Sequence, residues 1–173
     1  MNDLRERVQA GQTGALESIL NAIPGYGGYR DKQLRRDADR LLRDHIASEL
    51  AQQGRKLPEL QRRLIDAGQL SLVDDLERVD RRLLTLADQV RTAAGGYAGF
   101  FDALKVREAE LDRLYEFDQA LLGEIPRLEE GIAALETTLS SQVGVAEAIR
   151  DLGETVDRLG DYWRGRREIV LQI

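Results

Sequence analysis

Apolar residues recur at alternating steps of four and three along much of this chain, and this spacing constrains the fold more than any other feature. Steps of four and three place apolar side chains on one side of an α-helix, where they form a seam that faces a partner helix. The sequence therefore predicts three helices with coiled-coil-like seams. The seams consist of Leu72, Leu76, Val79, Leu83, Leu86 and Val90; of Leu121, Ile125, Leu128, Ile132, Leu135 and Leu139; and of Ile149, Leu152, Val156, Leu159 and Trp163.

Upstream of these seams, residues 31–54 predict a further amphipathic helix that ends at Gly54. Its apolar positions are Leu34, Ala38, Leu41, Leu42, Ile46 and Leu50. Residues 55–70 are expected to form a connector with one short helix around Leu60, Leu64 and Ile65, in which Pro58 occupies the first turn and Gly68 ends the helix.

Helix boundaries follow from local signals. Ser71 is expected to cap the N-terminus of the first seam helix, because its hydroxyl can accept a bond from a free backbone amide. The second seam helix is expected to start near Asp102, with Pro126 causing either a kink or a break. Serine and glycine over residues 140–144 indicate a bend before the last helix.

Together these elements predict a single all-α domain over residues 1–173, built as an antiparallel bundle of long helices. Residues 25–95 form a first helical hairpin and residues 96–163 a second, with coiled-coil-like seams in both. Residues 1–24 are expected to be a weak amphipathic segment, since Gly11 and Gly14 each disfavour a helix by about 1 kcal/mol. Residues 164–173 are interpreted as a basic and apolar tail.

A short motif, Gly-Tyr-x-Gly-aromatic-x-Asp, occurs twice, beginning at Gly25 and at Gly96. The residues after each copy are also similar, so the chain could consist of two related hairpins. Helical sequences that use the same few residue types also match by coincidence, and both interpretations stay open. In antiparallel hairpins the two motifs would lie at the same end of the bundle.

The two motif loops form the candidate binding surface. Glycine frees backbone amides there, and aromatic and basic side chains surround them, so an anion or a planar ligand could bind. The alternative, which we favour, is that the aromatic rings close the end of the bundle while Asp31 and Asp102 cap the following helices. The residues of this surface are Tyr26, Tyr29, Arg30, Tyr97, Phe100, Phe101 and Lys105.

No catalytic residue, cofactor site or metal site is predicted. The chain has no cysteine and a single histidine, His45, and it contains neither a Gly-x-Ser-x-Gly turn nor a phosphate-binding Walker loop. Carboxylates cluster over residues 74–80 and 108–118, but no Glu-x-x-His pair accompanies them. Because arginines are interspersed among them, we interpret these clusters as solvated, salt-bridged faces.

Charge and hydropathy narrow the functional classes. The formal charge of -6 opposes binding to nucleic acids, and no apolar run approaches the length of a membrane span. The absence of cysteine fits a cytoplasmic protein. We expect a non-enzymatic scaffold or adaptor whose exposed seams bind a protein partner or a second copy, and we do not expect a small-molecule ligand.

Two alternatives accompany this expectation. In its long-helix architecture the chain resembles the phage-shock protein A class of coiled-coil membrane remodellers, which implies peripheral contact with a membrane through the first segment or the tail. A helical-bundle metalloenzyme that uses the carboxylate clusters is the alternative from the enzyme class.

Overall fold

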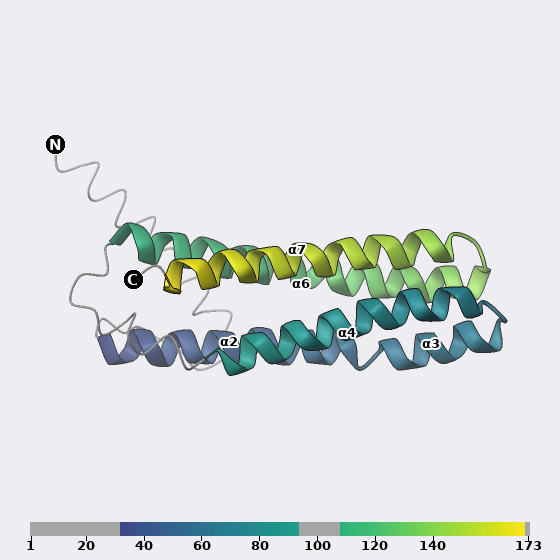
Figure 1. Ribbon diagram of the computed structural model, residues 1–173, viewed down its shortest axis with the longest axis horizontal. Helices are drawn as coiled ribbons and strands as arrows, with labels where there is room; N and C mark the ends of the chain where they lie inside the picture. Colours follow the sequence, from purple (N-terminus) through teal and green to yellow (C-terminus); the bar gives the residue numbers. More distant parts are fainter. Residues whose placement is uncertain (1–31, 94–107, 172–173) are drawn as a thin grey trace.

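The computed structural model describes residues 32–93 and 108–171, which form five α-helices (Figure 1). No strand occurs in these two ranges, and the predicted all-α fold is confirmed. The helices are α2 (Lys32–Gly54), α3 (Leu57–Asp66), α4 (Leu70–Thr92), α6 (Glu108–Ser141) and α7 (Val145–Leu171).

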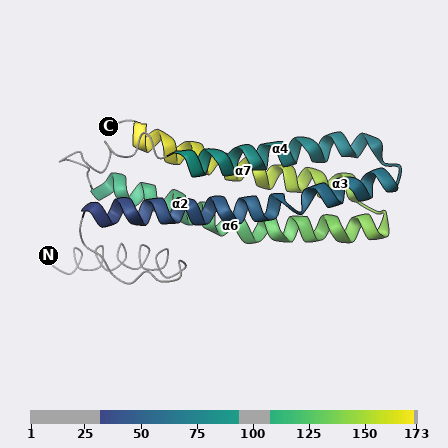
Figure 2. The same cartoon turned by 90° about the horizontal axis from the view of Figure 1, so that it is seen from below.

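The helices form two hairpins that pack against each other as a bundle. In the first hairpin α2 and α3 lie end to end and α4 returns beside them, and in the second α6 is antiparallel to α7 (Figures 1 and 2). Between the hairpins, α2 and α3 pack on α6, and α4 packs on α7. Neighbouring helices from different hairpins therefore run in the same direction.

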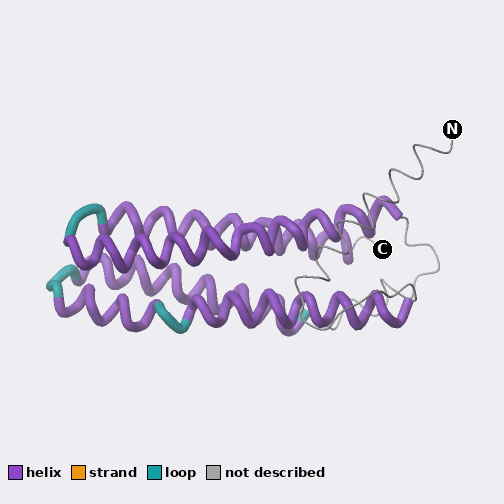
Figure 3. Tube along the Cα trace, turned by 180° about the vertical axis from the view of Figure 1, so that it is seen from behind, coloured by secondary structure: helices purple, strands orange, loops and turns teal. Residues whose placement is uncertain are grey.

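The two ends of the bundle differ. The α3–α4 connection, residues 67–69, and the α6–α7 connection, residues 142–144, lie at one end, which we call the turn end (Figure 3). Helices α2 and α6 both begin at the other end, the open end. Helix α4 runs from the turn end toward the open end and stops at Thr92, short of the level at which α2 begins. The two Gly-Tyr motifs lie outside the described residues, so their common end of the bundle stays a prediction.

The predicted seams form the interior of the bundle. Every seam position of α4, α6 and α7 is buried except Leu72, which is partly buried and packs against the core. Two predicted core residues are wrong, because Leu41 is 39% exposed and Ile65 is 52% exposed. Each immediately precedes or follows a buried leucine, and one residue along a helix turns the side chain by about 100°, away from the core.

The α3–α4 turn follows a regular helix stop. Gly68 has a positive φ of 72°, its amide donates to the Ile65 carbonyl at 2.9 Å, and the Gln69 amide donates to the Leu64 carbonyl at 3.0 Å. These are the two bonds of a Schellman motif. The predicted stop at Gly68 is confirmed, whereas the predicted cap at Ser71 is wrong, because α4 already begins at Leu70 and Gln69 precedes it without a side-chain capping bond.

Helices α6 and α7 each continue past a position where the sequence predicted a kink, a break or an end. Helix α6 continues through Pro126, so no break occurs there, and burial of the flanking Ile125 and Leu128 holds both sides of the proline against the core. Helix α7 continues to Leu171, through residues that the sequence assigned to a separate tail. Burial of Arg166 and Ile169 accounts for this extension.

The two hairpins are not identical in construction. The first is interrupted at residues 55–56, between α2 and α3, while α6 of the second is continuous. Because α2 neighbours α6 and α4 neighbours α7, one hairpin packs with its front and the other with its back. These differences neither require nor contradict a common origin of the two hairpins, and internal duplication stays a prediction of the sequence.

Candidate functional site

The aromatic surface predicted from the sequence lies outside the described residues. All seven of its members fall in residues 1–31 or 94–107, and the surface stays a prediction: Tyr26, Tyr29, Arg30, Tyr97, Phe100, Phe101 and Lys105. The described part of the chain presents a different candidate, which the sequence did not single out.

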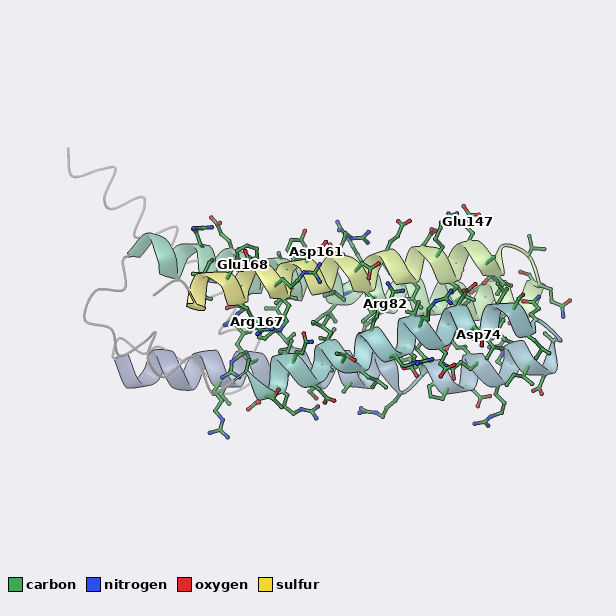
Figure 4. The ribbon with its side chains drawn as sticks, in the orientation of Figure 1. Asp74, Arg82, Glu147, Asp161, Arg167 and Glu168 are labelled. Atoms are coloured by element: carbon green, nitrogen blue, oxygen red, sulfur yellow. The ribbon has the colours of Figure 1, made fainter. Side chains whose placement is uncertain are left out.

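This candidate is a groove of about 370 Å³ between α4 and α7. Figure 4 views this face of the bundle and shows Arg82 and Arg167 between the two ribbons. We call it the arginine groove. Its walls are Arg81, Arg82, Thr85, Leu86 and Gln89 of α4, and Val156, Asp157, Gly160, Arg164 and Arg167 of α7.

Small residues on α7 keep the groove open. Gly153 and Gly160 are one heptad apart on the side of α7 that borders the grooves. A β-carbon at Gly153 would lie 3.4 Å from both the Arg82 guanidinium and the Val79 side chain. Because glycine has no side chain, the arginines of α4 can lie against the α7 backbone.

The groove is strongly basic for a protein of negative net charge. Four arginines line it and Asp157 is its only carboxylate. Arg82 donates to Asp157 at 2.6 Å, which offsets one of the four positive charges inside the groove. The groove therefore carries an excess of three positive charges on its walls.

The other arginines have carboxylate partners outside the groove or none in the described chain. Arg81 pairs with Glu77 at 3.0 Å, and Arg164 pairs with Asp161. Both carboxylates are exposed, so these pairs are weak and screened by solvent. No carboxylate oxygen of the described residues lies within 4.0 Å of Arg167.

Toward the turn end the groove continues with mixed charge. A second hollow of about 320 Å³ also lies between α4 and α7, and Arg82 and Asp157 border both hollows. Its charged walls are three arginines and three carboxylates: Arg78, Arg82, Arg150, Asp75, Glu154 and Asp157. Taken together, the arginine groove is basic toward the open end, and the second hollow is neutral toward the turn end.

Sequence reasoning missed this site because it interpreted mixed Arg and Asp segments as solvated faces. That interpretation holds for many individual pairs, such as Arg78 with Asp75. It does not reveal that arginines 82 to 86 residues apart in sequence share one groove. The glycines at positions 153 and 160, one heptad apart on the same helix, were the signal that could have indicated it.

The carboxylate clusters and His45 do not converge in the described chain. Over residues 32–93 and 108–171, no group of three or more His, Asp or Glu side chains is close enough to hold a metal ion. Asp75 and Glu77 pair with arginines instead. Burial, and secondarily the charge of Glu77, raises the pKa of Asp80. His45 lies partly buried on α2.

An ion pair inside the bundle is the other prominent charged feature. Asp118 of α6 and Arg166 of α7 are both buried, with two hydrogen bonds between them, one of which is 3.2 Å long. The Arg166 guanidinium lies 5.4 Å from the centre of the Trp163 ring. Because both side chains are enclosed by helices, we assign this pair to the stability of the bundle.

Comparisons with known proteins give this chain no relatives. No family model matches it, and neither a curated protein nor a solved structure gives a match. Among the helices that the structure describes, none has both the length and the apolar character of a membrane span.

Proposed function

We propose that the protein is a non-enzymatic helical adaptor that binds an acidic segment of a protein partner in the arginine groove between α4 and α7. The observation that carries the proposal is the excess of positive charge in this groove on a chain with a formal charge of -6. Opposite charges across an interface speed association and select the partner.

The form of the groove supports a polypeptide ligand. It lies along two parallel helices and has an apolar floor of Leu86 and Val156 between basic walls. An extended or helical segment could lie along it, with carboxylates on the arginines and an apolar side chain on the floor. Arginine binds carboxylates through two parallel N–H groups, which fixes the orientation of the bound group.

The groove replaces the seams as the proposed contact surface. The sequence suggested that exposed seams bind the partner, but the bundle buries those residues in its own interior. Partner binding therefore depends on surface residues of α4 and α7. A cytoplasmic location is part of the same proposal, and the membrane-associated alternative stays a prediction of the sequence.

Fluorescence anisotropy with a labelled, glutamate-rich helical peptide tests the proposal. A peptide of about 18 residues would span roughly 27 Å of the groove as a helix. We expect Arg167→Glu to raise the dissociation constant at least tenfold, equivalent to about 1.4 kcal/mol. Arg62→Glu is the matched control, because Arg62 is an exposed arginine on α3 that pairs with Glu59 on the same helix.

Two results would contradict the proposal. One is the absence of peptide binding at low salt, where charge attraction is strongest. The other is equal loss of affinity in Arg167→Glu and Arg62→Glu, which would show that only net charge matters and that the groove has no special role.

A further inference from the structure

Helices α4 and α7 share an uneven distribution of charge. Residues 70–80 of α4 contain four carboxylates and one arginine, whereas residues 81–92 contain three arginines and one carboxylate. Residues 145–157 of α7 contain four carboxylates and one arginine. Residues 158–171 contain four arginines, of which Arg166 is buried, and two carboxylates.

These gradients run in the same direction on the face of the bundle. Both helices begin at the turn end and pack side by side, so their acidic halves are adjacent and their basic halves are adjacent. In Figure 4 Asp74 and Glu147 lie toward the turn end, while Arg167 lies toward the open end. Counted over both helices, the charge is thus net negative toward the turn end and net positive toward the open end.

We propose that the acidic segment bound by the arginine groove belongs to a second copy of this chain, which docks face to face and antiparallel on α4 and α7. This inference rests on the proposed function of the groove. A two-fold axis across the two helices places the acidic half of each copy on the basic half of the other, with the same contacts made twice. A parallel arrangement would place like charges together.

The residue numbering sets a register for this dimer. The bond between Arg82 and Asp157 places these two residues at one level along the bundle. Glu147 and Arg167 lie ten residues on either side of Asp157, a distance of about 15 Å along the helix. A two-fold axis at the level of Asp157 therefore brings Arg167 to the level of Glu147 of the second copy.

The same register gives Arg164 acidic neighbours. Arg164 and Arg150 lie seven residues on either side of Asp157, so Arg164 reaches the level of Arg150 in the second copy. Three carboxylates surround Arg150 within 4.0 Å, and an additional guanidinium there would meet a net negative cluster. These carboxylates are Glu147, Asp151 and Glu154.

The face is large enough for a specific dimer. Helix α4 has 23 residues and is about 35 Å long, and two adjacent helices are about 20 Å wide, which gives roughly 700 Å² per copy. Standard interfaces bury about 800 Å² per partner. Since the face is mostly charged, we expect the association to weaken as salt increases.

Sedimentation velocity on the full chain tests the proposal. At about 100 µM protein, a dissociation constant of about 10 µM would leave most of the chain dimeric. We expect a dimer at low salt, and monomers for Arg167→Glu alone and for Glu147→Arg alone. An equimolar mixture of these two variants should form a dimer again, because each contact then pairs opposite charges. Arg62→Glu should stay dimeric, and circular dichroism should show equal helicity in all variants.

The outcomes separate this inference from the proposed function. A monomeric wild-type chain that still binds the glutamate-rich peptide would overturn the dimer and leave the adaptor proposal intact. A dimer unaffected by both charge reversals would place the interface elsewhere and overturn the inference. Release of monomer by an excess of the peptide would support both, since peptide and second copy compete for the same groove.

Discussion

Arg166 is the residue whose environment differs most from what its neighbours in sequence suggest. It lies in the segment Arg164-Gly165-Arg166-Arg167, which resembles a solvated basic tail. In the structure it is completely buried, pairs with Asp118 and lies over Trp163. Burying two charges costs several kcal/mol per ion, so the pair must keep good geometry to offset that cost.

Asp118→Ala is expected to lower the free energy of unfolding by about 3–5 kcal/mol, because it removes a carboxylate that pairs with a buried guanidinium. The double variant Asp118→Leu with Arg166→Met should lose much less, since it removes both charges and keeps the volume. Urea unfolding followed by circular dichroism measures both.

An exposed pair on the same helix gives the control for this prediction. Asp161 pairs with Arg164, and both side chains are more than half exposed. Asp161→Ala should therefore leave the unfolding midpoint unchanged within error. A loss for Asp118→Ala no larger than that for Asp161→Ala would show that the buried pair is not needed.

At the scale of the helices, two glycines in the second hairpin occupy opposite situations. Gly123 is exposed on α6, and a β-carbon there would have no neighbour within 4 Å. A β-carbon at Gly165 of α7 would lie 2.5 Å from the Phe117 ring of α6. The first glycine weakens its helix without a packing role, and the second allows α6 and α7 to approach closely.

The two glycines predict changes of opposite sign on substitution by alanine. Gly123→Ala should raise the free energy of unfolding by about 0.5–1 kcal/mol, because alanine loses less conformational entropy in a helix. Gly165→Ala should lower it by about 1–3 kcal/mol through overpacking against Phe117. Thermal unfolding of the two variants measures the difference, and stabilisation of both would contradict the close contact.

Across the whole molecule, the interior changes character along its length. Near the turn end the interior consists of apolar side chains from α3, α4, α6 and α7. The buried polar side chains of the described residues all lie farther from the two turns. The apolar set is Leu57, Leu60, Leu64, Leu76, Val79, Ile132, Leu135, Leu139, Val145, Ile149 and Leu152, and the polar set is Arg43, Gln53, Asp118, Glu124, Thr155 and Arg166.

Hydrogen exchange should follow this division. Amides of α3, the first half of α4, the end of α6 and the start of α7 should exchange slowest, because opening there exposes the apolar interior. Amides near the start of α2 and near Asp118 should exchange faster, because opening there exposes less apolar surface and allows buried charges to be hydrated. Uniform protection along α6 would contradict the prediction.

Much of this architecture was predictable because helix signals are local. The steps of four and three located the interior faces of α4, α6 and α7, and Gly68 located the α3–α4 turn. The predictions that Leu41 and Ile65 are buried were wrong, because an apolar residue beside a seam fits the same spacing whether or not another helix covers it. The prediction that Ser71 caps α4 was wrong because a serine can cap a helix only from the position before its first residue, and α4 begins one residue earlier, at Leu70.

The sequence by itself determined that the chain is all-α and which side of each long helix turns inward, since both depend on spacing within a few residues. Only the tertiary structure decided which seams meet, because every seam is apolar and could face another helix or another chain. It also decided that Arg166 is buried while Arg167 lines a groove. Adjacent residues on a helix point in directions about 100° apart, and what each one meets depends on helices far away in the sequence.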